Sequence, residues 1–199
     1  MESLIVSQIT GKLTKDFIRK NHYTRTCHNG PMGWGLFRGK ELVGVCAFAT
    51  PCSEAVRASL FGEDHKDRVT ELHRLFTFDD LPSNAGTWFI ARALRGLIQY
   101  RPKIRGIISF ADTTEGHTGA IYKASNFTQY GFTGSSTFYR DKDGRLRHPR
   151  QSGVNITKEH ANEMGWTPEK RGAKARFVKI IGPDRREIRK WQDELLLAS

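Results

Sequence analysis

An amphipathic helix between two apolar strands is the feature that most constrains the fold of this chain. Residues 85–100, AGTWFIARALRGLIQY, carry a broad apolar face at helical spacing, and Pro102 ends the helix. Residues 70–78 before the helix read as a strand. Residues 104–112, IRGIISFAD, read as a buried strand that ends in an acid. Strand, helix and strand in this order predict a sheet covered by helices.

The flanking segments extend this pattern in both directions. A short helix capped by Thr14 is expected at 14–21, and a hairpin over residues 33–50 turns at Arg38-Gly39-Lys40. Later segments predict, in order, a helix that opens near Gly116, a strand pair from Gly131, a hairpin turning at 141–144, a strand at 177–182 and a closing helix at 184–199. The prediction is an α/β fold with a mixed central sheet and helices on both faces, an order that resembles the acyl-CoA N-acyltransferase (GNAT) fold. Residues 1–150 would form the catalytic domain, and residues 151–199 a basic C-terminal extension packed on it.

The net charge points to a partner class. Lysine and arginine number 32 against 21 acidic residues, which gives a formal charge of +11. Such an excess favours phosphate contacts with nucleic acid, and the alternative is a basic enzyme with no polyanionic partner. Two basic clusters are interleaved with aromatic residues that would stack on bases: Lys142, Arg145, Arg147, His148 and Arg150, then Lys170, Arg171, Lys174 and Arg176, with Phe138, Tyr139 and Trp166 among them.

Other features concern compartment and covalent framework. The sequence contains no run of eighteen apolar residues and no N-terminal secretory pattern, so we expect a cytoplasmic protein without a membrane span. The three cysteines are odd in number and form no C-x-x-C pair, which argues against a disulfide framework or a zinc knuckle. Cys46 lies in an apolar run and is expected to be buried.

Four segments carry a family resemblance: Asn21-His22-Tyr23, Glu71-Leu72-His73-Arg74-Leu75, Leu81-Pro82-Ser83-Asn84, and a last segment with Ala111-Asp112, Gly116-His117, Gly119, Tyr122, Ala124, Phe127 and Gly131. Across residues 15–150 they resemble the Mom family of phage DNA-modification proteins. The resemblance implies a GNAT-like transferase that converts adenine in double-stranded DNA to an N6-carbamoylmethyl (acetamido) derivative. It also implies protection of phage DNA from restriction, in the host cytoplasm.

The candidate catalytic residues each have a structural alternative. His22 would act as base or proton carrier, and Tyr23 would donate to a developing oxyanion; otherwise they are an ordinary loop pair. Asp112, at the carboxyl end of a strand, would act as a base or else cap the next helix. Arg74 would grip a phosphate or carboxylate, or be a solvated charge. Tyr122 would be a general acid for the leaving group, or a core residue.

The candidate cofactor residues lie at two helix starts. Ser83 and Asn84 precede the helix at 85, and Gly116, His117 and Gly119 precede the next one, where free N–H groups would hold an anion. The first turn has one glycine and no leading basic residue, unlike the usual CoA-binding turn, so a standard acetyl-CoA site is doubtful. The alternative for the glycines is tight helix–strand packing.

The acyl donor is open between glycyl-tRNA and acetyl-CoA. Glycyl-tRNA is favoured because a glycyl amide on N6 is an isomer of the carbamoylmethyl product. A glycyl group transferred to N6 would therefore give this product after a rearrangement. His22, Tyr23 and Asp112 would also suit a divalent metal such as iron. The oligomeric state, including a dimer, is open. The alternative functions are an acetyl-CoA-dependent N-acetyltransferase acting on a protein or small molecule, and a non-catalytic DNA-binding protein.

Overall fold

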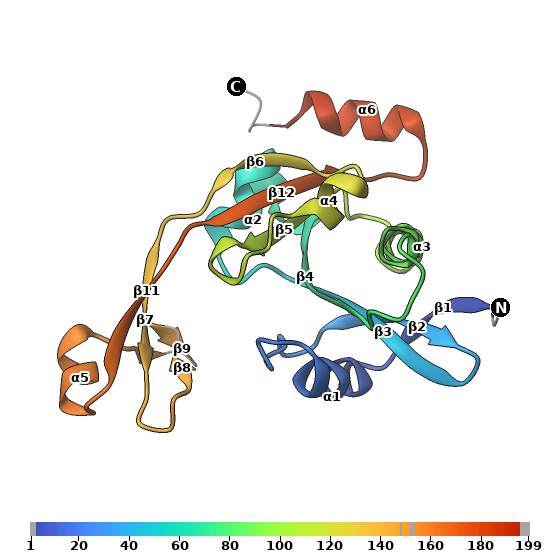
Figure 1. Ribbon diagram of the computed structural model, residues 1–199. Helices are drawn as coiled ribbons and strands as arrows, with labels where there is room; N and C mark the ends of the chain where they lie inside the picture. Colours follow the sequence, from blue (N-terminus) through green and yellow to red (C-terminus); the bar gives the residue numbers. More distant parts are fainter. Residues whose placement is uncertain (1–2, 148, 152–153, 196–199) are drawn as a thin grey trace. The chain divides into compact units, whose positions relative to one another are not determined.

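The computed structural model describes residues 3–147, 149–151 and 154–195, and it places a seven-stranded mixed sheet at the centre of the fold (Figure 1). The strand order is β1-β2-β3-β4-β5-β12-β6; β1 to β4 pair antiparallel, and β4 pairs with β5 in parallel. The strand bounds are β1 Leu4–Ile9, β2 Met32–Arg38, β3 Glu41–Ala49, β4 Val69–Thr77, β5 Gly106–Asp112, β6 Thr128–Phe132 and β12 Lys174–Ile180.

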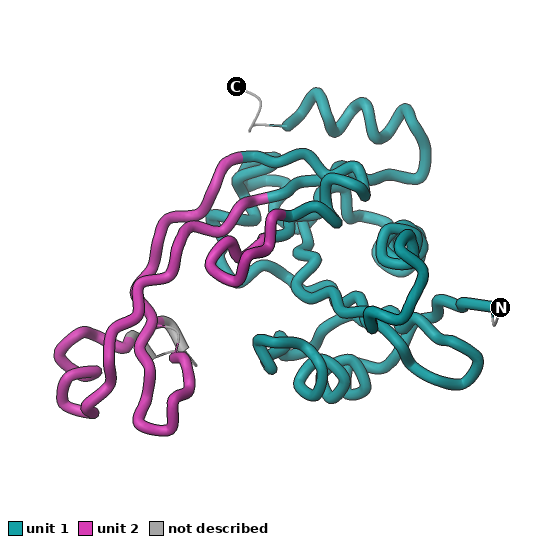
Figure 2. Tube along the Cα trace, in the orientation of Figure 1, with its two compact units in different colours: residues 1–110, 119–130, 177–199 teal, residues 111–118, 131–176 magenta. Residues whose placement is uncertain are grey.

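The chain divides into two compact units (Figure 2). The first comprises residues 1–110, 119–130 and 177–199, and its helices are α1 Gly11–Asn21, α2 Glu54–Phe61, α3 Ala85–Tyr100, α4 Ala120–Ala124 and α6 Arg185–Asp193, with a 3-10 turn η1 at Glu63–Arg68. The second comprises residues 111–118 and 131–176, with the strand order β11-β7-β8 (Thr167–Arg171, Ser136–Arg140, Leu146–Arg147), the pair β9 and β10 (Arg150–Gln151, Val154–Asn155), α5 Lys158–Glu163 and η2 Thr113–Glu115.

The predicted fold class is confirmed, but the division of the chain differs from the expected boundary at residue 150. Strand β12 lies between β5 and β6 in the central sheet, and α6 belongs to the first unit. Residues 174–180, which were assigned to the C-terminal extension, are therefore part of the core sheet. The described helices include none with the length and apolar character needed to cross a bilayer.

Helices α1 and α3 cover opposite faces of the sheet, because successive residues of a strand point to opposite sides. At Gly33 of β2 the Thr14 side chain of α1 occupies the place of a Cβ, whereas Trp34, the next residue, fills the place of a Cβ at Gly96 of α3. Ile18 of α1 is fully buried in a cluster with Val45 and Ala47. The glycines let both helices approach the sheet closely.

Helix α1 begins three residues before the expected start. Thr10, not Thr14, is the N-cap, and its side chain accepts from Leu13 N at 3.2 Å. Thr14 lies inside the helix, fully buried, and its hydroxyl donates to Thr10 O at 2.9 Å. Thr10 and Thr14 are both residues that favour a helix N-cap. Because Thr14 packs against β2 inside the helix, Thr10 is the cap.

The helix expected near Gly116 is shorter and starts later. The 3-10 turn η2 comes first, and α4 is a five-residue helix that begins at Ala120. Gly116 and Gly119 both have left-handed backbones, with φ of 75° and 74°. At Gly119 the ring of Phe177 occupies the place of a Cβ, so this glycine serves close packing.

Candidate active site

The parallel pairing of β4 and β5 stops partway along both strands. The ladder joins Val69–Glu71 to residues 106–108 and ends there. At the next step the Ser109 hydroxyl donates to Leu72 O at 2.9 Å, which satisfies a carbonyl that would otherwise belong to the ladder. The carboxyl ends of strands in an open α/β sheet are where ligands bind, so this opening is the natural place for a site.

His22 and Tyr23 stand at the end of α1, as a stacked pair of rings. His22 is the C-cap, and its N–H donates to Ile18 O at 2.9 Å. Its ring centroid lies 4.5 Å from that of Tyr23 with an interplanar angle of 29°. His22 is 9% exposed and Tyr23 is 49% exposed. One ring is thus shielded while the other is presented to solvent.

Hydrogen bonds from Thr24 favour one tautomer of the neutral His22 ring. The backbone N–H of Thr24 donates to His22 Nδ1 at 3.2 Å, and the Thr24 hydroxyl lies 2.9 Å from the same nitrogen. A nitrogen that accepts from a backbone N–H carries no proton, so the neutral ring of His22 has its proton on Nε2. The remaining ring nitrogen is therefore a donor, which suits a proton-donating or oxyanion-stabilising role.

Arg74 holds the loop that carries this network. Its Nε donates to the Thr24 hydroxyl and to Thr26 O, each at 3.1 Å, and Nη2 donates to the Thr26 hydroxyl at 3.1 Å. Nη1 donates to His73 O at 2.7 Å. Burial lowers the pKa of Arg74 from its usual value. All three guanidinium nitrogens have partners within the protein, and through them Arg74 holds Thr24 beside His22. A grip by Arg74 on a phosphate or carboxylate stays a prediction.

Tyr122 of α4 lies within electrostatic range of the same group. Its ring centroid is 5.6 Å from Phe127 and 5.3 Å from Phe177, so the ring is a packing element. Its hydroxyl shares a hydrogen bond with Ser109; burial raises its pKa, and Tyr23 and Arg74 also act on it. The ring of Tyr122 packs against Phe127 and Phe177, and a role for its hydroxyl as a general acid stays a prediction.

Sequence reasoning missed a carboxylate–imidazole pair on β4. Glu71 Oε1 lies 3.3 Å from His73 Nδ1, and the ring of His28 stands edge-on to His73 at 6.0 Å. Burial lowers the pKa of His73, against the raising effect of Glu71. Residues two apart on a strand share a face, and this spacing was the signal that could have found the pair.

Asp112 belongs to the second unit, and it is a cap there. It ends β5, its Oδ1 accepts from Thr114 N at 3.1 Å, and its other oxygen lies 3.5 Å from Lys174 Nζ. The turn that it caps is η2, not the expected helix. Its side chain is 12% exposed. A role for its carboxylate in chemistry stays a prediction.

The predicted cofactor residues lie at less favourable positions than expected. Helix α4 begins at Ala120 and is too short to offer the anion site expected at Gly116, His117 and Gly119. Asn84 is the N-cap of α3, without a side-chain cap bond. Ser83 and Asn84 are exposed. An anion at this helix start stays a prediction.

The predicted metal ligands are divided between the two units, with His22 and Tyr23 on the first and Asp112 on the second. Within the described part of the chain, no three histidine, cysteine, aspartate or glutamate side chains gather as a metal site would require. The residues present therefore give no support to the metal that the sequence suggested.

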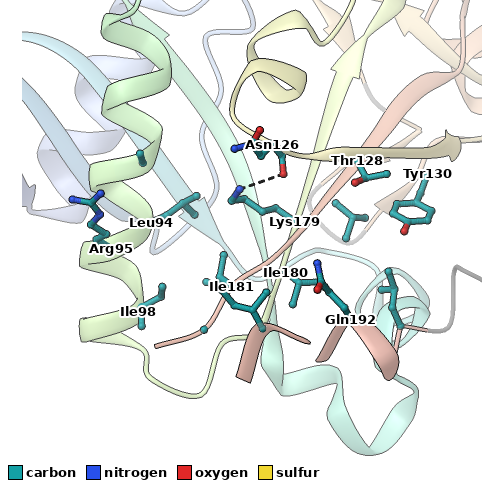
Figure 3. A pocket seen from close by; sticks show the side chains of 15 residues that line it. Leu94, Arg95, Ile98, Asn126, Thr128, Tyr130, Lys179, Ile180, Ile181 and Gln192 are labelled. Carbon is teal, nitrogen blue, oxygen red and sulfur yellow. Dashed lines mark hydrogen bonds between the residues drawn. The ribbon is translucent and has the colours of Figure 1, made fainter. Parts of the chain in front are cut away.

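A cavity of about 560 Å³ lies elsewhere on the first unit, between α3, β12 and α6 (Figure 3). It is largely apolar, with Leu94, Ile98 and Ile181 among its lining residues. Its Lys179 donates to Ser125 O at 2.9 Å and to Asn126 O at 3.2 Å, and burial lowers the pKa of this lysine. Lys179 thus holds the end of α4, and none of the predicted site residues lines the cavity.

The sequence matches the Mom protein family over residues 3–188. This chain belongs to the Mom protein family. The match continues past residue 150, so it includes residues 151–188, which the sequence motifs left unassigned.

Two similar proteins illustrate the relation. Methylcarbamoylase mom of Escherichia phage Mu is 33% identical over 150 residues, which are 74% of this chain and 61% of that protein. The chain thus matches about three-fifths of the length of this Mom relative. An N-acetyltransferase from Staphylococcus aureus Mu50 superposes with a TM-score of 0.52 at 9% identity, covering 89% of this chain and 97% of its own. That likeness confirms the GNAT-like fold of this Mom family member.

Three arginines of the second unit of this Mom family member, Arg140, Arg147 and Arg171, form ion pairs with acidic residues of the same unit. Asp141 accepts from Arg147 Nε at 2.8 Å and from the backbone N–H of Arg145 at 2.7 Å. Arg140 donates to Glu169 at 3.0 Å, and Arg171 to Glu115 at 2.5 Å. Tyr139, expected to stack on a base, is 7% exposed and therefore unavailable. His148 lies outside the described residues, and so does the side chain of Arg150.

Arg147 and Arg145 are expected to differ in their effect on stability, although both were candidates for phosphate contact. Arg147→Met would leave a carboxylate that is 6% exposed without its cation, and we expect the melting temperature to fall by about 3–8 °C. Arg145→Met removes a pair in which both side chains are 70% exposed, and we expect a shift of about 1 °C or less. Calorimetry of both variants checks this; equal shifts would contradict it.

Proposed function

We propose that this protein is a transferase that converts adenine in DNA to its N6-carbamoylmethyl derivative and so protects phage DNA from restriction. Membership of the Mom family over residues 3–188 carries the proposal. The relative named methylcarbamoylase, the acetyltransferase-like fold and the charge of +11 support it. We place the protein in the host cytoplasm, where its DNA substrate would be.

The reaction can proceed by acyl transfer followed by rearrangement. The N6 amine attacks the carbonyl carbon of an activated glycyl ester, the C–O bond breaks, and the proton lost from N6 ends on the leaving oxygen. The free glycyl amine then attacks C6 through a five-membered ring, one proton of that amine passes to the original N6, and the bond from C6 to the original N6 breaks. The original N6 becomes the terminal amide nitrogen. No oxidant is required, because the amide and the product are isomers.

The site supports the first of these steps. A tetrahedral intermediate develops negative charge on the former carbonyl oxygen, and the Nε2–H of His22 is a donor whose orientation Thr24 and Arg74 fix. The hydroxyl of Tyr122 is a second donor in electrostatic range of Tyr23 and Arg74. Burial raises the pKa of Tyr122, and we propose its hydroxyl as the general acid for the leaving oxygen.

We propose glycyl-tRNA as the donor, with acetyl-CoA as the rival. A glycyl ester on tRNA already has the activated carbonyl that the first step needs, and a tRNA suits a chain with an excess of positive charge. Residues 81–87 contain a single glycine, Gly86, which lies in the first turn of α3, and the Ile121 side chain lies 3.0 Å from the place of a Cβ there. The start of α3 is therefore closed against α4, which disfavours a pyrophosphate cradle.

Mass spectrometry of nucleosides tests the proposal. DNA from bacteria that express the protein should contain a deoxyadenosine heavier by about 57 mass units, the increment of a glycyl or carbamoylmethyl group. DNA from cells that express His22→Ala is the matched control. Unmodified DNA from cells that contain abundant folded protein would overturn the proposal. An acetylated protein or small molecule in its place would favour the acetyltransferase reading.

A further inference from the structure

The end of α1 and the loop after it carry concentrated positive charge beside His22 and Tyr23. Residues 11–30 contain five cationic side chains and one acid: Lys12, Lys15, Arg19, Lys20 and Arg25 against Asp16. Lys12 pairs with Asp16 at 2.7 Å. Among the described residues, no carboxylate lies within ion-pair distance of Arg19, Lys20 or Arg25. All three of these side chains are exposed.

This charge faces the loop that carries the candidate site. Arg19 and Lys15 act on the pKa of Cys27, a loop residue whose pKa burial raises, and so does Arg74. The cations of α1 and the guanidinium of Arg74 therefore act on the same part of the loop. A surface with this sign attracts and holds polyanions such as the phosphates of a nucleic acid.

The backbone between His22 and Arg25 presents Tyr23 outward. The N–H of Arg25 donates to His22 O at 2.9 Å, which closes a turn over Tyr23 and Thr24. Arg25 adopts a φ of 50°, a left-handed conformation that an arginine rarely takes. Such strained positions cluster at ligand-binding sites, and this one places a cation two residues from the exposed ring of Tyr23.

Adenine N6 is stacked and paired in duplex DNA, so an enzyme that modifies it must extrude the base. Proteins that hold unpaired bases combine a cationic surface for the backbone with an aromatic ring on which a base stacks. The ring of Tyr23 is supported from one side by His22 at 4.5 Å, and the side chain is 49% exposed. Both components are therefore present within seven residues, 19–25.

We propose that Arg19, Lys20, Arg25 and the ring of Tyr23 form the surface that receives the target strand of DNA. The three cations contact phosphates on either side of the extruded adenine, and the Tyr23 ring stacks on that base. This assignment rests on the proposed function and identifies the surface on which the DNA substrate would bind. The hydrogen-bonded arginines of the second unit do not take part in it.

The first test compares two triple variants of the full chain. Arg19→Gln, Lys20→Gln and Arg25→Gln together should flatten the slope of log affinity for labelled duplex DNA against log salt by about 2–3, since each phosphate contact contributes roughly 0.9. Arg185→Gln, Arg186→Gln and Arg189→Gln on α6 remove the same charge from other exposed positions and should leave the slope unchanged. Equal changes in both variants, or no change in the first, would overturn the proposal.

The second test concerns the ring. Tyr23→Phe should keep affinity for a single-stranded oligonucleotide containing adenine within about twofold, whereas Tyr23→Leu should lose about tenfold. Equal losses in both variants would show that the hydroxyl, not the ring, makes the contact, and would overturn the stacking role. Unfractionated tRNA is the competing probe. If the α1 triple variant loses affinity for tRNA but not for DNA, the surface serves the donor and the proposal fails.

The outcomes separate this proposal from the proposed function. If wild-type protein modifies DNA while the α1 triple variant binds DNA like wild type, the surface is wrong and the function stands. If the slope flattens as expected but expressing cells contain no modified deoxyadenosine, the surface stands and the function is wrong.

Discussion

Replacing His22 with alanine is expected to reduce formation of the modified deoxyadenosine by about 10²–10⁴-fold, the usual contribution of a positioned proton donor. The expected melting temperature stays within a few degrees of wild type, because His22 ends α1 and the bond from its backbone N–H to Ile18 O is kept in the alanine variant. Nucleoside mass spectrometry gives the yield and calorimetry the stability. A yield within threefold of wild type would contradict the role assigned to this ring.

Thr24→Val is the matched variant for the network around His22. It removes the hydroxyl that lies 2.9 Å from His22 Nδ1 and accepts from Arg74, but it keeps the backbone N–H that donates to the ring. We expect a smaller loss than for His22→Ala, about tenfold, with little change in affinity for DNA. A loss equal to that of His22→Ala would show that the ring acts only when both bonds are present.

The pattern of apolar residues predicted the helices and hairpins whose sequences have clear periodicity and turn residues. The helix at 85–100 was predicted with the bounds it has, because its apolar face is broad and Pro102 follows closely. The hairpin over 33–50 also formed as predicted, turning at Gly39 with a φ of 58°. Strand β1 was missed, since it is a half-exposed edge strand with little alternation. The position of β12 between β5 and β6 depends on pairing between segments far apart in sequence, which no local pattern encodes.

The sequence named the residues of the candidate site, and their chemical roles stay predictions. His22, Tyr23, Arg74 and Tyr122 were all named from the sequence, and the structure brings them within electrostatic range of one another. The hydrogen bonds of Arg74 were not predicted, because its partners, Thr24 and Thr26, are supplied by a loop about fifty residues earlier. Side-chain hydrogen bonds across such distances become visible only when the strands are placed.

Two substitutions of Asp112 distinguish a structural role of its carboxylate from a chemical one. Asp112→Ala removes both the cap on η2 and the ion pair with Lys174, so we expect a loss of stability of about 0.5–2 kcal/mol whatever the role in chemistry. Asp112→Asn keeps an oxygen that can accept from Thr114 N but removes the negative charge. Its expected stability is therefore close to that of wild type.

Activity then decides between the two roles. If the carboxylate takes a proton in the reaction, Asp112→Asn should lower the yield of modified deoxyadenosine by about 10²-fold or more while the protein stays folded, because an amide cannot act as a base. If Asp112 is only a cap, the asparagine variant should work like wild type, and the alanine variant should lose activity only as far as it unfolds. The ion pair with Lys174 supplies a further control. Lys174→Met removes the cation 3.5 Å from the carboxylate without touching the cap, so its stability and its yield of modified deoxyadenosine show how much of the effect of Asp112→Asn comes from loss of the ion pair alone.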